Sequence, residues 1–118
     1  MREWKRSLHL EANVNERLLG MLGFAMRAGK IILGTDLVCK AMPKKGSGRV
    51  FLVAVSATAS DATKKKLFVK SEFYGIDAVE LKLDTDTLAQ RLGKSHPIAA
   101  VAVTDEAFAK EILKAAST

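Results

Sequence analysis

Apolar and polar residues recur along the chain with two different periods, which predicts strands and helices in turn. Two uninterrupted apolar runs, residues 49–55 and 98–103, are typical of strands buried on both faces of a sheet. Residues 79–83 alternate with a period of two, which predicts a strand exposed on one face at a sheet edge. The short apolar run at residues 30–33 predicts a fourth strand.

Capping residues stand before each stretch of helical periodicity, and glycine or proline follows most of these stretches. The predicted helices begin at Asn15, Thr35, Ser60, Asp84 and Thr104, and the first four reach Gly29, Met42, Gly75 and Gly93. In the third helix, Leu67, Val69 and Phe73 are expected to face the core. The alternation predicts an α/β fold, a three-layer sandwich with helices on both faces of a small, four-stranded, largely parallel sheet.

Two glycines, Gly20 and Gly23, lie inside the first predicted helix. Each costs about 1 kcal/mol there relative to alanine. Because they are three residues apart, they leave one smooth helix face. We expect that face to pack closely against another element, in preference to a close approach of an RNA backbone.

Residues 1–14 have no clear period and are expected to form a basic leader or linker, as a short helix or a tail, before a single domain at residues 15–118. No uncharged apolar run is long enough to cross a membrane, and no apolar signal region follows the charged start. We therefore expect a cytoplasmic protein without a membrane partner. Cys39 is the only cysteine, which excludes an intrachain disulfide.

Residues with catalytic or cofactor-binding patterns are scarce in the chain. The glycines at positions 46 and 48 precede a strand, whereas a dinucleotide fingerprint follows one and opens a helix. His9 and His96 have no neighbours at metal-ligand spacing, and no base can be nominated to activate a nucleophile. The sequence therefore predicts no catalytic residues, no metal and no cofactor.

Basic residues are concentrated in the first part of the chain. Residues 1–50 hold ten basic and four acidic side chains, whereas residues 51–118 hold nine of each. The whole excess of +6 thus lies in the first part, which favours a polyanionic partner bound there. Charge alone leaves open the alternative of a solvated surface that aids solubility.

The stretch at residues 27–49 gathers these cations around a predicted helix start. Phosphates could be neutralised by Arg27, Lys30, Lys40, Lys44 and Lys45. Backbone N–H groups at Gly34, Thr35 and Asp36 could bind an anion. The loop Ser95, His96, Pro97 and Ile98 offers an imidazole and an apolar tip for unstacked bases. For His96, and for the lysines at 64–66, an ordinary solvated surface remains the alternative.

Four segments of the chain resemble the superfamily of kink-turn RNA-binding ribosomal proteins, of the archaeal large-subunit seven-A-e and eukaryotic L-thirty type. The resemblance is greatest to its small bacterial branch, YlxQ. The segments are residues 27–30 (RAGK), 34–40 (GTDLVCK), 59–66 (ASDATKKK), and 92–94 (LGK) with 105–110 (DEAFAK).

This resemblance implies a three-layer α/β/α sandwich with a mixed sheet, and non-enzymatic RNA binding in a ribosomal or translational setting. The family's RNA-binding motif is Gly-x-Asn-Glu-x-x-Lys, which Gly34 and Lys40 match. Asp36 and Leu37 stand where the family has Asn and Glu, the residues that reach base edges. Leu37 accepts no hydrogen bond, and an ionised Asp36 repels nearby phosphates. These departures put kink-turn specificity in question more than RNA binding itself.

Three hypotheses follow for the function. The first is an RNA-binding accessory protein of the ribosome or of translation, with structured RNA and translation proteins as partners. The second is a protein-interaction module on the same fold, which Leu37 favours. The third is a substrate-recruiting domain of a larger RNA-modifying enzyme.

Overall fold

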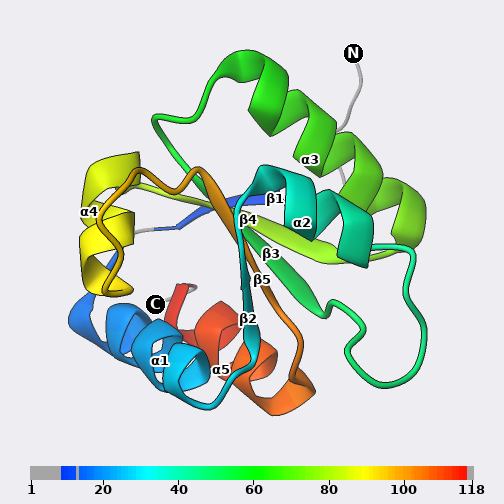
Figure 1. The fold of residues 1–118 in the computed structure, drawn as a ribbon, viewed down its shortest axis with the longest axis horizontal. Helices are drawn as coiled ribbons and strands as arrows, with labels where there is room; N and C mark the ends of the chain where they lie inside the picture. The colour runs from blue at the N-terminus through cyan, green and yellow to red at the C-terminus, as the bar shows by residue number, and fades with distance from the viewer. Residues whose placement is uncertain (1–8, 13, 117–118) are drawn as a thin grey trace.

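A computed structural model of the chain describes residues 9–12 and 14–116, in which helices and strands alternate (Figure 1). In chain order the elements are β1 (His9–Ala12), α1 (Glu16–Arg27), β2 (Ile31–Leu33), α2 (Thr35–Ala41), β3 (Leu52–Ser56), α3 (Asp61–Tyr74), β4 (Asp77–Leu81), α4 (Thr85–Arg91), β5 (Ala100–Val103) and α5 (Glu106–Ala116).

The sheet is mixed, with the strand order β1-β4-β3-β5-β2. β4 pairs in parallel with both β1 and β3, whereas β5 runs antiparallel to β3 and to β2. The four strands predicted from the sequence are all present, and the mixed sheet implied by the family resemblance is confirmed. The expectation of a largely parallel sheet, drawn from alternation alone, is wrong because β5 is reversed.

β1 is a fifth strand, within the residues expected to form a leader. It pairs with β4 in register from His9 opposite Ala78 to Ala12 opposite Leu81. Residues 9–12 are therefore neither a short helix nor a tail, and of the other leader residues only Val14 lies within the described part of the chain. Because β1 covers it, β4 has a neighbour on each side and is not at the edge where the sequence placed it.

Two apolar cores lie on opposite faces of the sheet, as a three-layer sandwich requires. Leu52 and Ala54 of β3 point into the core shared with α1, α4 and α5. Val53 and Val55 of the same strand point into the core shared with α2 and α3, the two helices that cover the other face of the sheet in Figure 1. Since successive strand residues face opposite sides, this explains why residues 50–55 are apolar throughout.

α3 buries a different face from the one predicted. Leu67, Phe68 and Ser71 are buried, and these positions share one side of a helix. Val69 and Phe73, expected in the core, point away from that side and are 45% and 79% exposed. The outer surface of α3 is consequently both apolar and basic.

The helix starts confirm three predicted caps and correct two. Asn15, Ser60 and Asp84 each accept a hydrogen bond from the backbone of the following turn. α2, in contrast, is preceded by Gly34 without a side-chain cap, so Thr35 is its first residue rather than its cap. At α5 the cap is Asp105, whose Oδ1 accepts from the Phe108 N–H at 3.0 Å, and the Thr104 hydroxyl donates instead to the Lys30 carbonyl.

The glycines inside α1 face open space. A Cβ atom at Gly20 would meet nothing within 4 Å, and one at Gly23 would meet only the flexible Arg27 guanidinium, at 3.7 Å. The expected close packing of this helix face is therefore wrong among the described residues.

Candidate nucleic-acid interface

The start of α2 is held in place by the backbone of Gly34. Gly34 adopts φ 93° and ψ 147°, a region that side-chain-bearing residues rarely enter. Its N–H donates to the Ala100 carbonyl at 2.9 Å, where β5 begins. The first turn of α2 therefore lies beside the end of the loop that joins α4 to β5, as Figure 1 shows.

That α4–β5 loop exposes three of its four predicted contact residues. Ser95, His96 and Pro97 are exposed. Ile98 is only 5% exposed, belongs to the core with α1 and α5, and donates its N–H to the Thr85 carbonyl at 3.2 Å. The expectation that Ile98 forms an apolar tip is wrong, because the chain has already turned inward into β5 at this residue.

We name residues 34–37 and 95–97 the sheet-end surface. Leu37 is 57% exposed and Asp36 is also exposed, so the two positions that depart from the family motif are both presented to solvent. α2 has only seven residues, which is too short for its dipole alone to define an anion site. The binding chemistry of this surface must therefore come also from side chains around it.

Lysines from α3 join α2 next to the sheet-end surface. A hollow of about 340 Å³ lies between the two helices, lined by Asp36, Cys39, Lys40, Lys66 and Lys70. We name it the lysine hollow. For Lys66 the sequence left open an ordinary solvated surface, since the spacing within α3 does not reveal which helix it meets. Lys64 differs, because it is largely buried and pairs with Glu80 at 3.2 Å.

Arg27 and Lys30 lie apart from this cluster. β2 separates Lys30 from Gly34, and the Lys30 carbonyl accepts from the Thr104 N–H at 2.9 Å. Three strand residues span about 10 Å. The Arg27 guanidinium lies 4.9 Å from the centre of the Phe24 ring and lines a hollow with Arg91 and Gly93. The structure thus divides the predicted basic stretch: Lys30 lies at the opposite end of β2 from Gly34, and Arg27 lies beside the end of α4.

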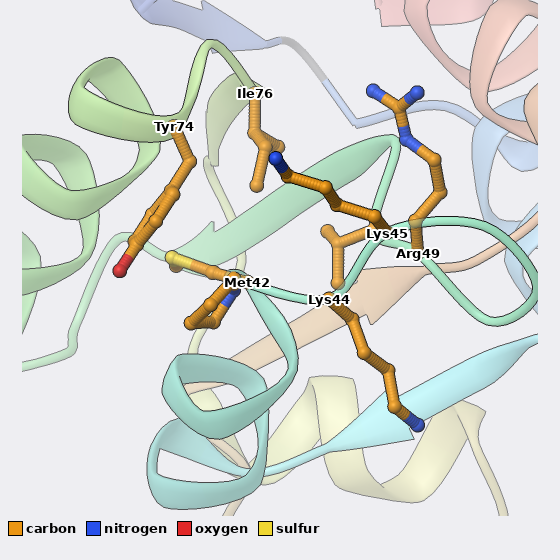
Figure 2. A pocket seen from close by; sticks show the side chains of 8 residues that line it. Met42, Lys44, Lys45, Arg49, Tyr74 and Ile76 are labelled. Carbon is orange, nitrogen blue, oxygen red and sulfur yellow. The ribbon is translucent and has the colours of Figure 1, made fainter.

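Lys44 and Lys45 form a third group, at the far end of α2. They lie in the exposed loop between α2 and β3 and line a cavity together with Arg49 and Tyr74 (Figure 2). Nothing in the sequence pattern pointed to Tyr74, since α3 and this loop meet only in the fold.

Two carboxyl groups with shifted pKa values lie outside these clusters. Hydrogen bonds from Thr87 lower the pKa of Asp84, the cap of α4. Burial raises the pKa of Asp77 in β4. Within residues 9–12 and 14–116, no three His, Cys, Asp or Glu side chains gather as a metal site would require. No helix of that part of the chain is long and apolar enough to cross a membrane.

Curated relatives match most of the chain. The chain is 33% identical over 96 residues to the RNA-binding protein YlxQ of Enterococcus faecium, covering 81% of this chain and 87% of that protein. It is 33% identical over 93 residues to the RNA-binding protein YlxQ of Bacillus subtilis (strain 168), covering 79% and 88% respectively.

Solved structures share the fold. A protein of unknown function from Bacillus halodurans C has a TM-score of 0.78 and 31% identity, over 88% of this chain and all of that one. The 15.5kD RNA binding protein of Giardia lamblia has a TM-score of 0.70 over 99% of this chain and 95% of its own. Its identity is 17%, so it supports the fold alone. The family model for "Ribosomal protein L7Ae/L30e/S12e/Gadd45 family" matches residues 16–113, from the first residue of α1 into α5, and the chain belongs to this family.

Proposed function

We propose that the chain binds structured RNA, without catalysing a reaction, through the sheet-end surface and the adjoining lysine hollow. The observation that carries the proposal is the Gly34–Ala100 hydrogen bond, because it joins two exposed segments from distant parts of the chain beside Lys40, Lys66 and Lys70. The YlxQ relatives are named RNA-binding proteins, which supports the same assignment. A ribosomal or translational setting and a cytoplasmic location are parts of the proposal.

Phosphate contacts dominate binding of this kind. Lysine ammonium groups neutralise phosphates, release counterions and make affinity depend on salt. Asp36 lacks the amide, and Leu37 the carboxylate, that the family uses to recognise base edges at these two positions. We therefore propose that the lysines supply most of the affinity and that the RNA is recognised mainly by its shape.

The lysine hollow can be tested by removing two of its charges. We expect Lys40→Ala with Lys66→Ala to weaken binding of an rRNA hairpin and to lower the slope of log affinity against log salt by about 1 to 2. The measurement is a titration at several salt concentrations. Lys110→Ala with Lys114→Ala is the matched control, since both lysines are exposed on α5 and make only surface ion pairs. Equal slopes in the two double variants would contradict the proposal.

A protein-interaction module is the second candidate, favoured by the exposure of Leu37. A protein partner that covered Leu37 would remove its exposed apolar side chain from water. This side chain has no group that could form a hydrogen bond to RNA. If the wild-type protein fails to bind hairpins at low salt but retains a protein partner after nuclease treatment, this candidate replaces the first.

A further inference from the structure

A cavity of about 260 Å³ lies at the end of α2 that is remote from the sheet-end surface. Its walls come from the loop after α2, the last residue of α3 and the start of the segment leading into β4 (Figure 2). We name it the tyrosine cavity. Its volume is just below the range of roughly 300–1,000 Å³ that encloses drug-sized ligands, so it suits one small planar group and its immediate substituents.

The floor of the tyrosine cavity is apolar and buried. Met42, Val50 and Ile76 line it and are all buried in the core shared with α2 and α3. Tyr74 forms a wall and is 38% exposed. Its ring makes an edge-to-face contact with the ring of Phe73, with ring centres 4.9 Å apart, and Gly75 ends α3 directly after it in the left-handed conformation. An aromatic ring over an apolar floor is a surface on which a flat ring stacks.

The rim of the cavity carries positive charge and, among its lining residues, no carboxylate. In Figure 2 the Lys45 side chain extends across the cavity toward Ile76, while Lys44 and Arg49 point outward in different directions. The Arg49 guanidinium lies 4.8 Å from the centre of the ring of Phe51, a residue that packs against the core on the other face of the sheet. Of these three cations, Lys45 is therefore the one that reaches over the apolar floor, where a phosphate beside a flat ring would lie.

We propose that the tyrosine cavity holds one unpaired nucleotide of the bound RNA, with its base against Tyr74 and a phosphate at Lys45. The inference rests on the RNA binding proposed above and names a second part of the same ligand. α2 spans about 10 Å, and Lys40 lies in its last turn. A strand leaving the sheet-end surface would pass Lys40 and reach the cavity within a few nucleotides.

The proposal predicts that a single-stranded tail on a hairpin strengthens binding through Tyr74. The experiment compares a hairpin without a tail to the same hairpin with six adenosines added at its 5′ or 3′ end. Stacking on an aromatic side chain is worth about 1–3 kcal/mol per base, so the better tail should raise wild-type affinity at least about fivefold. Tyr74→Ala should abolish that gain and leave the affinity for the tail-less hairpin within about twofold.

Two further variants separate stacking from charge and from folding. Phe24→Ala removes an exposed aromatic residue on α1, across the sheet, and should keep the full tail effect. Lys45→Glu leaves the ring in place and should also remove the tail effect, even if Tyr74→Ala lowers the melting temperature. A tail effect of equal size in the wild type and both cavity variants overturns the inference.

Failure of the proposed function gives a different result. If the tail-less hairpin does not bind at any salt concentration, structured-RNA binding is wrong. Titration of isotope-labelled protein with hexa-adenylate, followed by NMR, then tests the cavity directly. Shifts centred on Tyr74 and Ile76 support a single-strand site that stands alone, and their absence overturns it.

Discussion

The two ends of α2 differ in what each provides. At the start, the backbone is specialised: Gly34 has a positive φ and is bonded to Ala100, while the exposed side chains are one carboxylate and one leucine. At the far end, the side chains are specialised: Lys45, Arg49 and Tyr74 are among the residues that line a cavity with an apolar floor. The start of α2 thus offers a defined backbone geometry, whereas the cavity with an aromatic ring lies about one helix length away.

Gly34→Ala is expected to have the largest effect on the free energy of unfolding, because alanine does not readily adopt the backbone conformation found at the start of α2. Backbone conformations of this kind cost about 1–3 kcal/mol for a residue other than glycine. A Cβ atom at Gly34 would meet nothing within 4 Å, so the loss of unfolding free energy would measure backbone strain without a steric clash. Chemical denaturation gives the measurement.

Gly20→Ala is the matched control for that variant. Gly20 lies within α1, also with nothing within 4 Å of a new Cβ atom, and has no positive φ. Alanine should therefore stabilise the helix by about 0.5–1 kcal/mol. Destabilisation of equal size by both variants would contradict the special role of Gly34.

The next largest effect is expected from restoring the family motif at the start of α2, which should increase the specificity for a kinked hairpin. We expect the wild type to bind a hairpin kinked by tandem sheared G·A pairs about as tightly as one with those pairs broken. Asp36→Asn with Leu37→Glu returns the two groups that the family uses at base edges. The double variant should then prefer the kinked hairpin by about 1–3 kcal/mol. Strong preference already in the wild type would show that these two residues do not limit specificity.

Acid is expected to have the smallest effect. It should lower the stability of α4, the helix that precedes the loop of the sheet-end surface. The pKa of Asp84 is lowered in the folded chain by hydrogen bonds from Thr87. Its stabilising effect is therefore complete above the unfolded pKa of about 3.9 and is lost as pH falls through the lower folded value. Asp84→Asn keeps a capping side chain but does not titrate. Unfolding free energy of this variant should depend less on pH below about pH 4 than that of the wild type.

Local patterns in the sequence predicted much of the fold. Residues 49–55 and 98–103 contain strands as their apolar runs indicated, and the caps at Asn15, Ser60 and Asp84 depend only on neighbouring residues. β1 was missed because its pairing with β4 joins residues far apart in the chain and leaves no period of its own. The reversed direction of β5 is likewise invisible to a count of alternating elements.

The candidate site was less predictable than the fold, because it depends on which elements meet. Lys40 was identified from the family motif, but Lys66 and Tyr74 become relevant only when α3 lies against α2 and its following loop. Ile98 was misjudged for the opposite reason. Its neighbours in sequence are exposed loop residues, yet the chain enters the core at this position.

Short outer strands have a consequence for the behaviour of the protein at high concentration. Among the described residues, the sheet is bounded by β1 with four residues and β2 with three. Strands this short present few unpaired backbone groups to a neighbouring molecule, which is a common protection against edge-to-edge aggregation. The fully buried, apolar strands β3 and β5 lie between other strands, so the segments most prone to form intermolecular sheets are kept from contact while the chain is folded.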